Sequence, residues 1–109
     1  MNRDILLVLT TCGDSDTAAR LAESIIGDRL GACVSAINGV TSTYRWQGAI
    51  ERATETLLLI KTTPERYAAL EEHIRSRTGY ELPEIVAVRP EGGYAAYLNW
   101  VALETGGTE

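Results

Sequence analysis

Two long β-like segments in the middle of the chain restrict the fold more than any other feature of the sequence. Residues 32–46 and 50–63 are rich in β-branched and aliphatic side chains, and Gln47-Gly48 between them supplies residues typical of a tight turn. Each segment is about twice the usual strand length. A chain of 109 residues cannot cover so long a hairpin with its own helices, so we expect residues 41–52 to project from the body.

A second turn signal, Asn38-Gly39, lies inside the first long segment. Asn-Gly is a strong hairpin signal, so the chain has the alternative of folding back at this point. That alternative adds a strand of awkward length, because a second tight turn follows at Gln47-Gly48. We therefore favour a kink or bulge at Gly39 within one long strand.

The segments on either side of the hairpin predict a strand and a helix before it and a helix after it. Residues 5–11 form a continuous apolar run, which indicates a strand covered on both edges and on at least one face. Asp14 is a good cap for a helix whose apolar residues recur at spacings of three and four as far as residue 30, with Gly31 closing it. Thr63-Pro64 begins a second helix, which ends near Gly79.

The last segments complete a familiar order of elements. Residues 85–88 form a fourth strand, and residues 97–102 have the spacing of a short final helix. The order predicts an α+β, ferredoxin-like βαββαβ fold with an extra C-terminal helix, in which helices cover one face of an antiparallel sheet. We expect one domain over residues 1–109, with an ordered core over about 4–104 and a flexible tail over 105–109.

Composition argues against several classes of partner. The formal net charge is -5 and no run of Lys or Arg is present, so we expect no nucleic-acid partner and no docking on an anionic membrane. The apolar stretches at 5–9 and 57–60 are too short to span a bilayer, and the N-terminus does not resemble a signal peptide. A cytoplasmic location follows, in which the two cysteines are free thiols.

The projecting hairpin also predicts self-association. It carries Tyr44 and Trp46, and exposed aromatic residues on an unpaired edge promote aggregation unless a partner covers them. A closed homo-oligomer in which each hairpin pairs with a neighbouring subunit solves this problem, although the hairpin alone does not give the number of subunits.

Six short sequence motifs, taken in order, resemble the CutA family of divalent-cation tolerance proteins across residues 4–104. They are LVLTTC at 7–12, LGACV at 30–34, GVTSTYRWQG at 39–48, LLIKTT at 58–63, YELPEI at 80–85 and YLNW at 97–100. The resemblance implies a homotrimer of ferredoxin-like subunits, similar in architecture to PII signalling proteins. It also implies an association with tolerance of divalent cations, and copper binding in some members.

The copper site of that family does not carry over residue by residue. Metal-binding members are thought to use a Cys near the end of the first strand, which matches Cys12, or one two places earlier, where this chain has Thr10. They are also thought to use His residues just before a Pro-Tyr pair. Those His positions are Arg77 and Thr78 here, and Gly79 replaces the Pro. Soft thiolate and imidazole ligands select copper, whereas Arg cannot ligate a cation at neutral pH. We expect no required cofactor and, at most, weak binding of copper or another divalent cation.

Both cysteines have a simpler interpretation. Cys12 lies between a strand and a helix N-terminus, where the helix dipole would lower the thiol pKa and favour a metal or redox role. We prefer a small buried apolar side chain for Cys12, and a core position for Cys33.

Four residues are candidates for a cleft or an interface. Lys61 ends an apolar strand and either binds an anionic ligand or pairs with Glu84, and we prefer the ion pair. Trp46 and Tyr80 either stack on a small molecule or pack at a trimer interface, and we prefer packing.

Other polar residues give weaker signals. Glu81, Glu84 and Asp14 have the oxygen ligands that a hard cation prefers, but solvated carboxylates are more common. His73 lies among charged residues and is expected at the surface. The sequence shows no Gly-rich phosphate loop and no Ser or Cys paired with a His, so we expect no enzyme.

Three functions remain open at this point. The first is a CutA-like trimer linked to metal-ion tolerance. The second is a PII-like sensor whose inter-subunit clefts, lined by Lys61 and Trp46, take a small anionic ligand. The third is a trimer that acts only as a scaffold for another protein.

Overall fold

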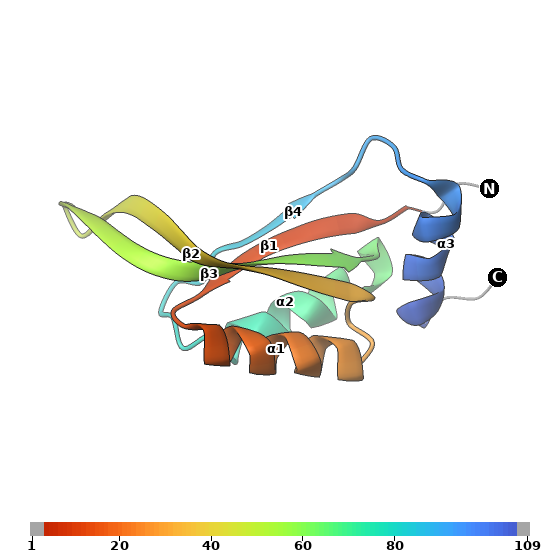
Figure 1. Ribbon diagram of the computed structural model, residues 1–109, viewed down its shortest axis with the longest axis horizontal. Coiled ribbons are helices and arrows are strands. Elements are labelled where there is room, and N and C mark those ends of the chain that lie inside the picture. Colours follow the sequence, from red (N-terminus) through yellow and green to blue (C-terminus); the bar gives the residue numbers. More distant parts are fainter. Residues whose placement is uncertain (1–3, 107–109) are drawn as a thin grey trace.

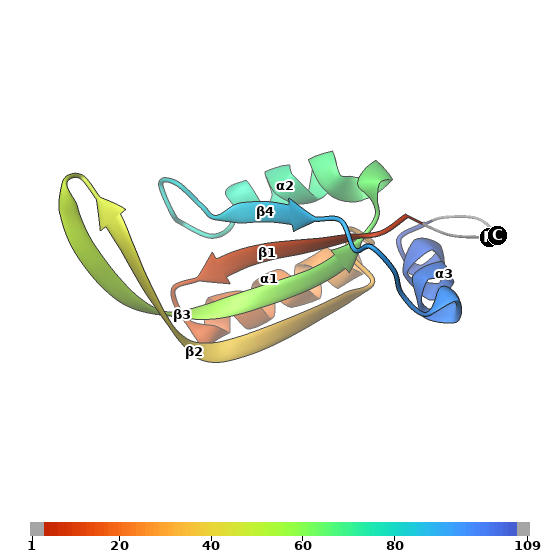
Figure 2. The ribbon, with the colours of Figure 1, turned by 90° about the horizontal axis from the view of Figure 1, so that it is seen from above.

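The computed structural model describes residues 4–106, which form an antiparallel four-stranded sheet with helices on one face (Figure 1). The strands are β1 (Leu6–Cys12), β2 (Cys33–Trp46), β3 (Ala49–Thr62) and β4 (Ile85–Val88), in the spatial order β2-β3-β1-β4. Helices α1 (Ser15–Gly27) and α2 (Tyr67–Arg75) lie side by side on that face, and α3 (Ala95–Glu104) packs at the end of the sheet (Figure 2). The ferredoxin-like prediction is confirmed.

The core lies between the helices and one face of the sheet. Val8 and Cys12 of β1 and Leu58 and Ile60 of β3 are fully buried there, and they alternate with residues that point to the other face. Because β1 is paired with β3 on one side and β4 on the other, it is the covered central strand that its apolar run predicts.

The long hairpin is one continuous pair of strands of 14 residues each. The register shifts between Ile37 and Val40, where Gly39 has a φ of 75°, so the predicted bulge is confirmed and the fold-back at Asn38-Gly39 is wrong. Gln47 and Gly48 form the turn with φ values of 49° and 84°. Two successive positive φ angles are typical of the tight turn that matches strand twist.

The outer part of this hairpin projects from the body as predicted. The pairing of β1 with β3 ends at Cys12 and Thr56, so residues 41–54 of the hairpin pair only with each other (Figure 1). The molecule is consequently elongated, with extents of 48 × 27 × 22 Å. Tyr44 and Ile50 on the projecting part are 45% and 68% exposed.

The first helix starts where the sequence predicts but ends earlier. Asp14 caps it, with its Oδ1 accepting a hydrogen bond from the Thr17 backbone N–H at 2.7 Å. The helix ends at Gly27 instead of residue 30, because Arg29 adopts a φ of 56°. Gly31 is therefore not the helix terminator. It is required by packing, since a Cβ there would lie 2.9 Å from Ile60 Cγ2.

The second helix is preceded by a short turn. Pro64–Arg66 forms a 3₁₀ turn, and α2 follows and ends at Arg75, before the predicted end near Gly79. Thr63 has the extended backbone of a cap, but its side chain makes no capping hydrogen bond, so that part of the prediction is wrong.

The C-terminal helix is longer than predicted, and the residue after it is buried. Helix α3 is longer than the expected 97–102, and Thr105 after it is only 4% exposed. The Thr105 hydroxyl donates to the Val101 carbonyl at 2.9 Å, and Arg66 Nε donates to the Thr105 carbonyl at 3.1 Å. The flexible tail over 105–109 stays a prediction: these contacts involve its first residue, and residues 107–109 lie outside the described part of the chain.

Neither α1 nor α2 covers the second face of the sheet (Figure 1). Residues paired directly across strands share a face, and the pairs Leu9–Leu59 and Leu9–Val86 place aliphatic side chains there. We call this surface the open sheet face, and its apolar residues are Leu7, Leu9, Ile37, Leu57, Leu59, Val86 and Val88. Val86 is 50% exposed and Ile37 47%. Within residues 4–106, no helix is both long and apolar enough to span a membrane.

Candidate functional site

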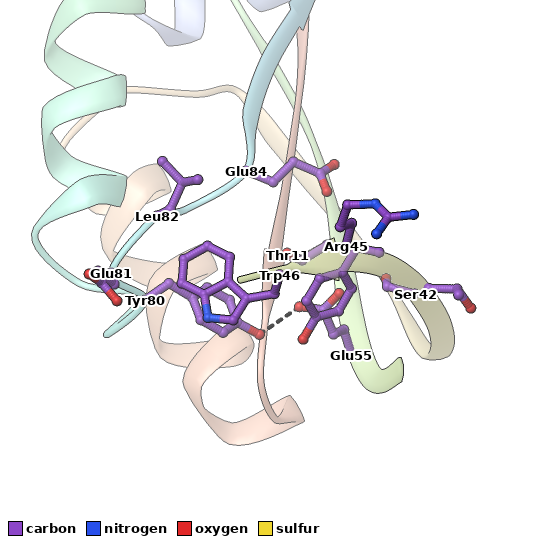
Figure 3. Close-up of a pocket in the computed structure, with 11 residues that line it drawn as sticks. Thr11, Ser42, Arg45, Trp46, Glu55, Tyr80, Glu81, Leu82 and Glu84 are labelled. Carbon is purple, nitrogen blue, oxygen red and sulfur yellow. Dashed lines mark hydrogen bonds between the residues drawn. The ribbon is translucent and has the colours of Figure 1, made fainter. Parts of the chain in front are cut away.

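A cavity of about 600 Å³ lies between the projecting part of the hairpin and the loop before β4 (Figure 3). We call it the arm pocket. Its lining comes from β1, both hairpin strands and the loop, and consists of Thr11, Ser42, Thr43, Tyr44, Arg45, Trp46, Glu55, Tyr80, Glu81, Leu82 and Glu84. Its volume is typical of a small-molecule site.

Local backbone features position these side chains. Glu55 pairs with Val40 immediately after the bulge, so it lies where the hairpin begins to leave the body. Gly79 follows α2 with a φ of 80°, a conformation that glycine adopts without strain. Tyr80 comes directly after it and points into the arm pocket (Figure 3).

A short hydrogen bond joins the loop to the hairpin. Tyr80 Oη donates to Glu55 Oε2 at 2.6 Å (Figure 3). Burial raises the pKa of Tyr80, and the hydrogen bond to Glu55 together with its negative charge raises that pKa further. Burial also acts to raise the pKa of Glu55, but hydrogen bonds from Ser42, Tyr80 and Thr11 outweigh it and hold that pKa below its ordinary value. At neutral pH the pair is thus a phenol donating to a carboxylate.

The charge of the arm pocket is predominantly negative. Glu55, Glu81 and Glu84 contribute carboxylates, and Arg45 is the one cationic residue in its lining. Carboxylate oxygens suit hard cations, and an excess of them disfavours an anion. The arm pocket therefore suits a cationic or neutral ligand better than an anionic one.

The structure brings together three of the four cleft candidates and separates the fourth. Trp46, Tyr80 and Glu84 all line the arm pocket. Lys61 pairs with Leu7 in the sheet, whereas Ile85, next to Glu84, pairs with Thr10, three residues or roughly 10 Å further along β1. Lys61 Nζ instead donates to Ser35 Oγ at 3.0 Å, so the predicted ion pair with Glu84 is not formed within the subunit.

The two cysteines differ in their surroundings. Cys12 is fully buried in the core, the position that the simpler interpretation gives it. Burial raises the pKa of its thiol, and the charges of Asp14 and Glu55 raise it further, so the expected lowering by the helix dipole is wrong. Cys33 is only half-buried on the open sheet face, with its Sγ 3.9 Å from Lys61 Nζ, and the expected core position is wrong.

His73 is buried between α1 and α2, with 7% of its surface exposed, so the surface prediction is wrong. Its Nε2 lies 2.7 Å from Ser24 Oγ, and its Nδ1 lies 3.8 Å from Asp28 Oδ2. A Ser is therefore paired with the His, contrary to the sequence prediction. The Ser24 hydroxyl donates to the Leu21 carbonyl at 2.8 Å, which leaves His73 as the donor to Ser24. The arrangement ties the helices together and does not activate Ser24.

The sequence does not reveal the role of Glu55 or the burial of His73, for different reasons. His73 lies three residues after Leu70 and one before Ile74, both fully buried, so the helical spacing itself indicates a buried position. The charged residues beside His73 in the sequence predict exposure instead, and that prediction is wrong. Glu55 lies between two threonines in a β-branched segment, and nothing in the sequence distinguishes it from a solvated strand residue.

The described residues do not fit a copper site within one subunit. Across residues 4–106, no three His, Cys, Asp or Glu side chains lie close enough together to hold a metal ion. Arg77 and Thr78 line a separate cavity next to α1, together with Arg20, and two guanidinium groups repel a cation. Cys12 as a metal ligand stays a prediction, and its burial works against it.

These features define a class of small α+β protein: a ferredoxin-like subunit with an overlong hairpin, a polar pocket beneath it and an uncovered sheet face. The family model described as CutA1 divalent ion tolerance protein matches residues 6–104. The chain belongs to the CutA1 family.

Individual relatives agree with this assignment. The chain is 39% identical over 100 residues to a protein of Thermus thermophilus named divalent-cation tolerance protein CutA, covering 92% of this chain and 97% of the relative. It is 37% identical to a chloroplastic CutA 1 of Oryza sativa, covering 92% of this chain but 56% of that longer protein. The crystal structure of CutA1 from Oryza sativa superposes with a TM-score of 0.91 at 35% identity, covering 94% of each chain.

Proposed function

We propose that the protein acts as a cytoplasmic homotrimer in the tolerance of divalent cations, and that it binds such cations weakly at the arm pocket. The relation to divalent cations comes from the family. The observation that carries the rest is the charge of the arm pocket, whose lining contains three carboxylates and one guanidinium group. No three acidic side chains among residues 4–106 lie close enough together to chelate an ion, so we expect the cation to keep its water shell and to be held by the net negative charge of the lining. No catalytic step and no required cofactor are part of this proposal.

The open sheet face supports the homotrimer. In an isolated subunit its aliphatic residues face solvent, among them Val86 at 50% and Val88 at 45% exposure. Contiguous apolar surface of this kind marks an interface, and a closed ring of like subunits covers it in every copy. The projecting hairpin gives each subunit a long edge with which to reach a neighbour.

The reduced state of both cysteines supports a cytoplasmic location. Cys12 and Cys33 are both free thiols. Reduced thiols persist in a reducing compartment, whereas secreted small domains usually form disulfides.

Calorimetric titration of the purified, tag-free protein with Mn²⁺ and with Cu²⁺ tests the cation proposal. We expect weak binding of Mn²⁺, with a dissociation constant of about 10⁻⁴ M or weaker. The double variant Glu81→Gln/Glu84→Gln should lose this binding, since both carboxylates line the arm pocket and are exposed. The variant Glu23→Gln, exposed on α1, is the matched control and should bind as the wild type does.

The Cu²⁺ arm separates this proposal from a copper site at Cys12. Because Cys12 is fully buried and its thiol pKa is raised, Cys12→Ser should leave cation binding unchanged. Stoichiometric Cu²⁺ binding that disappears in Cys12→Ser would overturn the arm-pocket proposal and make Cys12 a ligand.

A second candidate, a PII-like sensor of a small ligand, is favoured by the aromatic lining of the arm pocket. Trp46 and Tyr80 offer stacking surfaces within a cavity of about 600 Å³. The negative lining makes a cationic ligand more suitable than the anionic one that Lys61 suggests, since Lys61 lies outside this lining. A screen of cationic metabolites by thermal shift tests this candidate: a hit should be lost in Trp46→Ala and kept in Lys61→Ala.

A further inference from the structure

A second cavity, unrelated to the arm pocket, lies between α1 and the segment that follows α2. Its volume is about 350 Å³. We call it the interhelix cavity, and its polar lining consists of Thr17, Arg20, Ser24, Arg77, Thr78 and Gly79. None of these residues lines the arm pocket.

The charge of the interhelix cavity is opposite to that of the chain as a whole. Its lining contains two guanidinium groups, Arg20 and Arg77, and no carboxylate, whereas the whole chain has a net charge of -5. Within residues 4–106, neither arginine has a carboxylate oxygen within 4.0 Å. The charge of Arg20 contributes to lowering the pKa of Asp14, and Asp16 and Glu23 lie one helical turn before and after Arg20 on α1. Two like charges in the lining of one cavity, neither of them in an ion pair, attract an anion.

The hydrogen-bonding groups of the cavity match an oxyanion. Arg77 uses Nη1 for the His73 carbonyl at 3.3 Å and for Ser76 Oγ at 2.9 Å, which holds the side chain in place and leaves Nε and Nη2 for a ligand. The Thr78 hydroxyl accepts from the Tyr80 backbone N–H at 3.4 Å, so its own proton is available to donate. The hydroxyl protons of Thr17 and Ser24 are already donated to Asp14 and to the Leu21 carbonyl.

The backbone leaves room for such a ligand. Gly79 has a φ of 80°, and no heavy atom lies within 4 Å of where its Cβ would be, so no neighbouring group crowds this residue of the lining. The volume of about 350 Å³ exceeds what a phosphate ion alone needs and is in the range of small-molecule sites. Guanidinium groups bind phosphate through paired, charge-assisted hydrogen bonds.

We propose that the interhelix cavity binds a small phosphate-bearing anion, held by the guanidinium groups of Arg20 and Arg77 and by the Thr78 hydroxyl. The free ion and a small phosphomonoester share this chemistry. The proposal is independent of cation binding at the arm pocket, because the two cavities share no lining residue.

Calorimetric titration with inorganic phosphate and, separately, with phosphoserine tests the proposal. We expect saturable binding that weakens as chloride is added, since salt screens the attraction. Arg20→Gln and Arg77→Gln should each weaken it about tenfold or more. Arg75→Gln is the matched control: it removes the same charge two residues from Arg77, but Arg75 is exposed and pairs with Glu72 at 3.0 Å.

The two probes distinguish a site for the free phosphate ion from a site for a phosphomonoester. Binding of both probes identifies a phosphomonoester site, and binding of inorganic phosphate alone identifies a site for the free ion. The proposal is overturned if neither probe gives saturable binding up to about 10 mM, a concentration well above a millimolar dissociation constant. It is also overturned if Arg75→Gln weakens binding as much as Arg77→Gln does. Because Arg20, Arg75 and Arg77 are all exposed, their replacement should leave the fold intact, and circular dichroism checks this.

Discussion

At the scale of single residues, the contact between Tyr80 and Glu55 is the link between the loop and the projecting hairpin. The hydrogen bond is 2.6 Å long, and its acceptor is a half-buried carboxylate. Hydrogen bonds to charged groups are stronger than neutral ones, so their loss is measurable in stability as well as in the pocket.

Tyr80→Phe should destabilise the protein by about 1–2 kcal/mol, because it removes the donor and leaves the Glu55 carboxylate less satisfied. Tyr94→Phe is the control, since Tyr94 is 79% exposed. Urea unfolding at neutral pH measures the free energy of unfolding of both variants. Equal values for the two would contradict the stabilising role of the hydrogen bond.

The same variant should also unfold at a higher pH on acidification. Glu55 has a lowered folded pKa, so its contribution to stability is present above its unfolded pKa and is lost as the pH falls through the folded pKa. Without Tyr80 as donor that folded pKa rises, and the contribution is lost at a higher pH. An unchanged acid-unfolding midpoint in Tyr80→Phe would argue against this coupling.

His73 gives a second pH dependence at this scale. Burial lowers its pKa below the ordinary 6.5, the charge of Arg77 lowers it further, and Asp28 opposes the shift. Between 6.5 and the lower folded pKa, the unfolded chain binds a proton that the folded chain does not, so stability falls as the pH drops through this range. His73→Gln should flatten that slope between about pH 7 and 5. An unchanged slope in urea unfolding would contradict the burial of the only histidine.

At the scale of elements, the close approach of β3 to the end of α1 depends on Gly31. A Cβ at this position would meet Ile60 Cγ2 at 2.9 Å and Ile25 Cγ2 at 3.0 Å, both on fully buried side chains. Gly31→Ala should therefore destabilise the protein by about 1–3 kcal/mol through overpacking.

Gly27 provides the matched control. It lies in α1 with nothing within 4 Å of its Cβ position, so Gly27→Ala should be neutral or stabilising by about 0.5–1 kcal/mol. Urea unfolding compares the two variants, and a similar effect of both would contradict the packing account of Gly31.

The elements that the sequence predicts correctly are those with local signals. Gln47-Gly48 and Gly39 set the turn and the bulge of the long hairpin through their own backbone preferences. The sequence predicts an end of α1 that is too late, because Leu30 continues the apolar spacing. Leu30 is buried in the core, but its N–H bonds to the Ile25 carbonyl outside helical geometry. Leu30 is thus buried without being helical, so the apolar spacing predicts its burial but not its backbone conformation.

At the scale of the whole molecule, the sequence predicts the residues of the site better than their arrangement. Residue type and position indicate Trp46, Tyr80 and Glu84 as cleft candidates, and all three line the arm pocket. Lys61 ends a strand, and this position predicts that it lies with them. Only the register of β1 with β3 and β4 shows that it lies at the other end of the sheet. Register depends on tertiary pairing, which a single sequence does not specify locally.

The uncovered sheet face is the property of the whole molecule on which the proposed function depends. Val86 lies on that face at 50% exposure in the subunit, so Val86→Glu should cost an isolated subunit little. In a trimer that buries this face, the same change places a carboxylate in an apolar interface and should dissociate it. Ala68→Glu, exposed on α2, is the matched control and should keep the assembly intact.

Light scattering coupled to size exclusion measures the mass of the assembly and so tests the homotrimer. We expect a wild-type mass three times the 11.9 kDa of the subunit, the same mass for Ala68→Glu, and a smaller mass for Val86→Glu. A wild-type protein that elutes with the mass of a single subunit would contradict the homotrimer and, with it, the burial of the open sheet face.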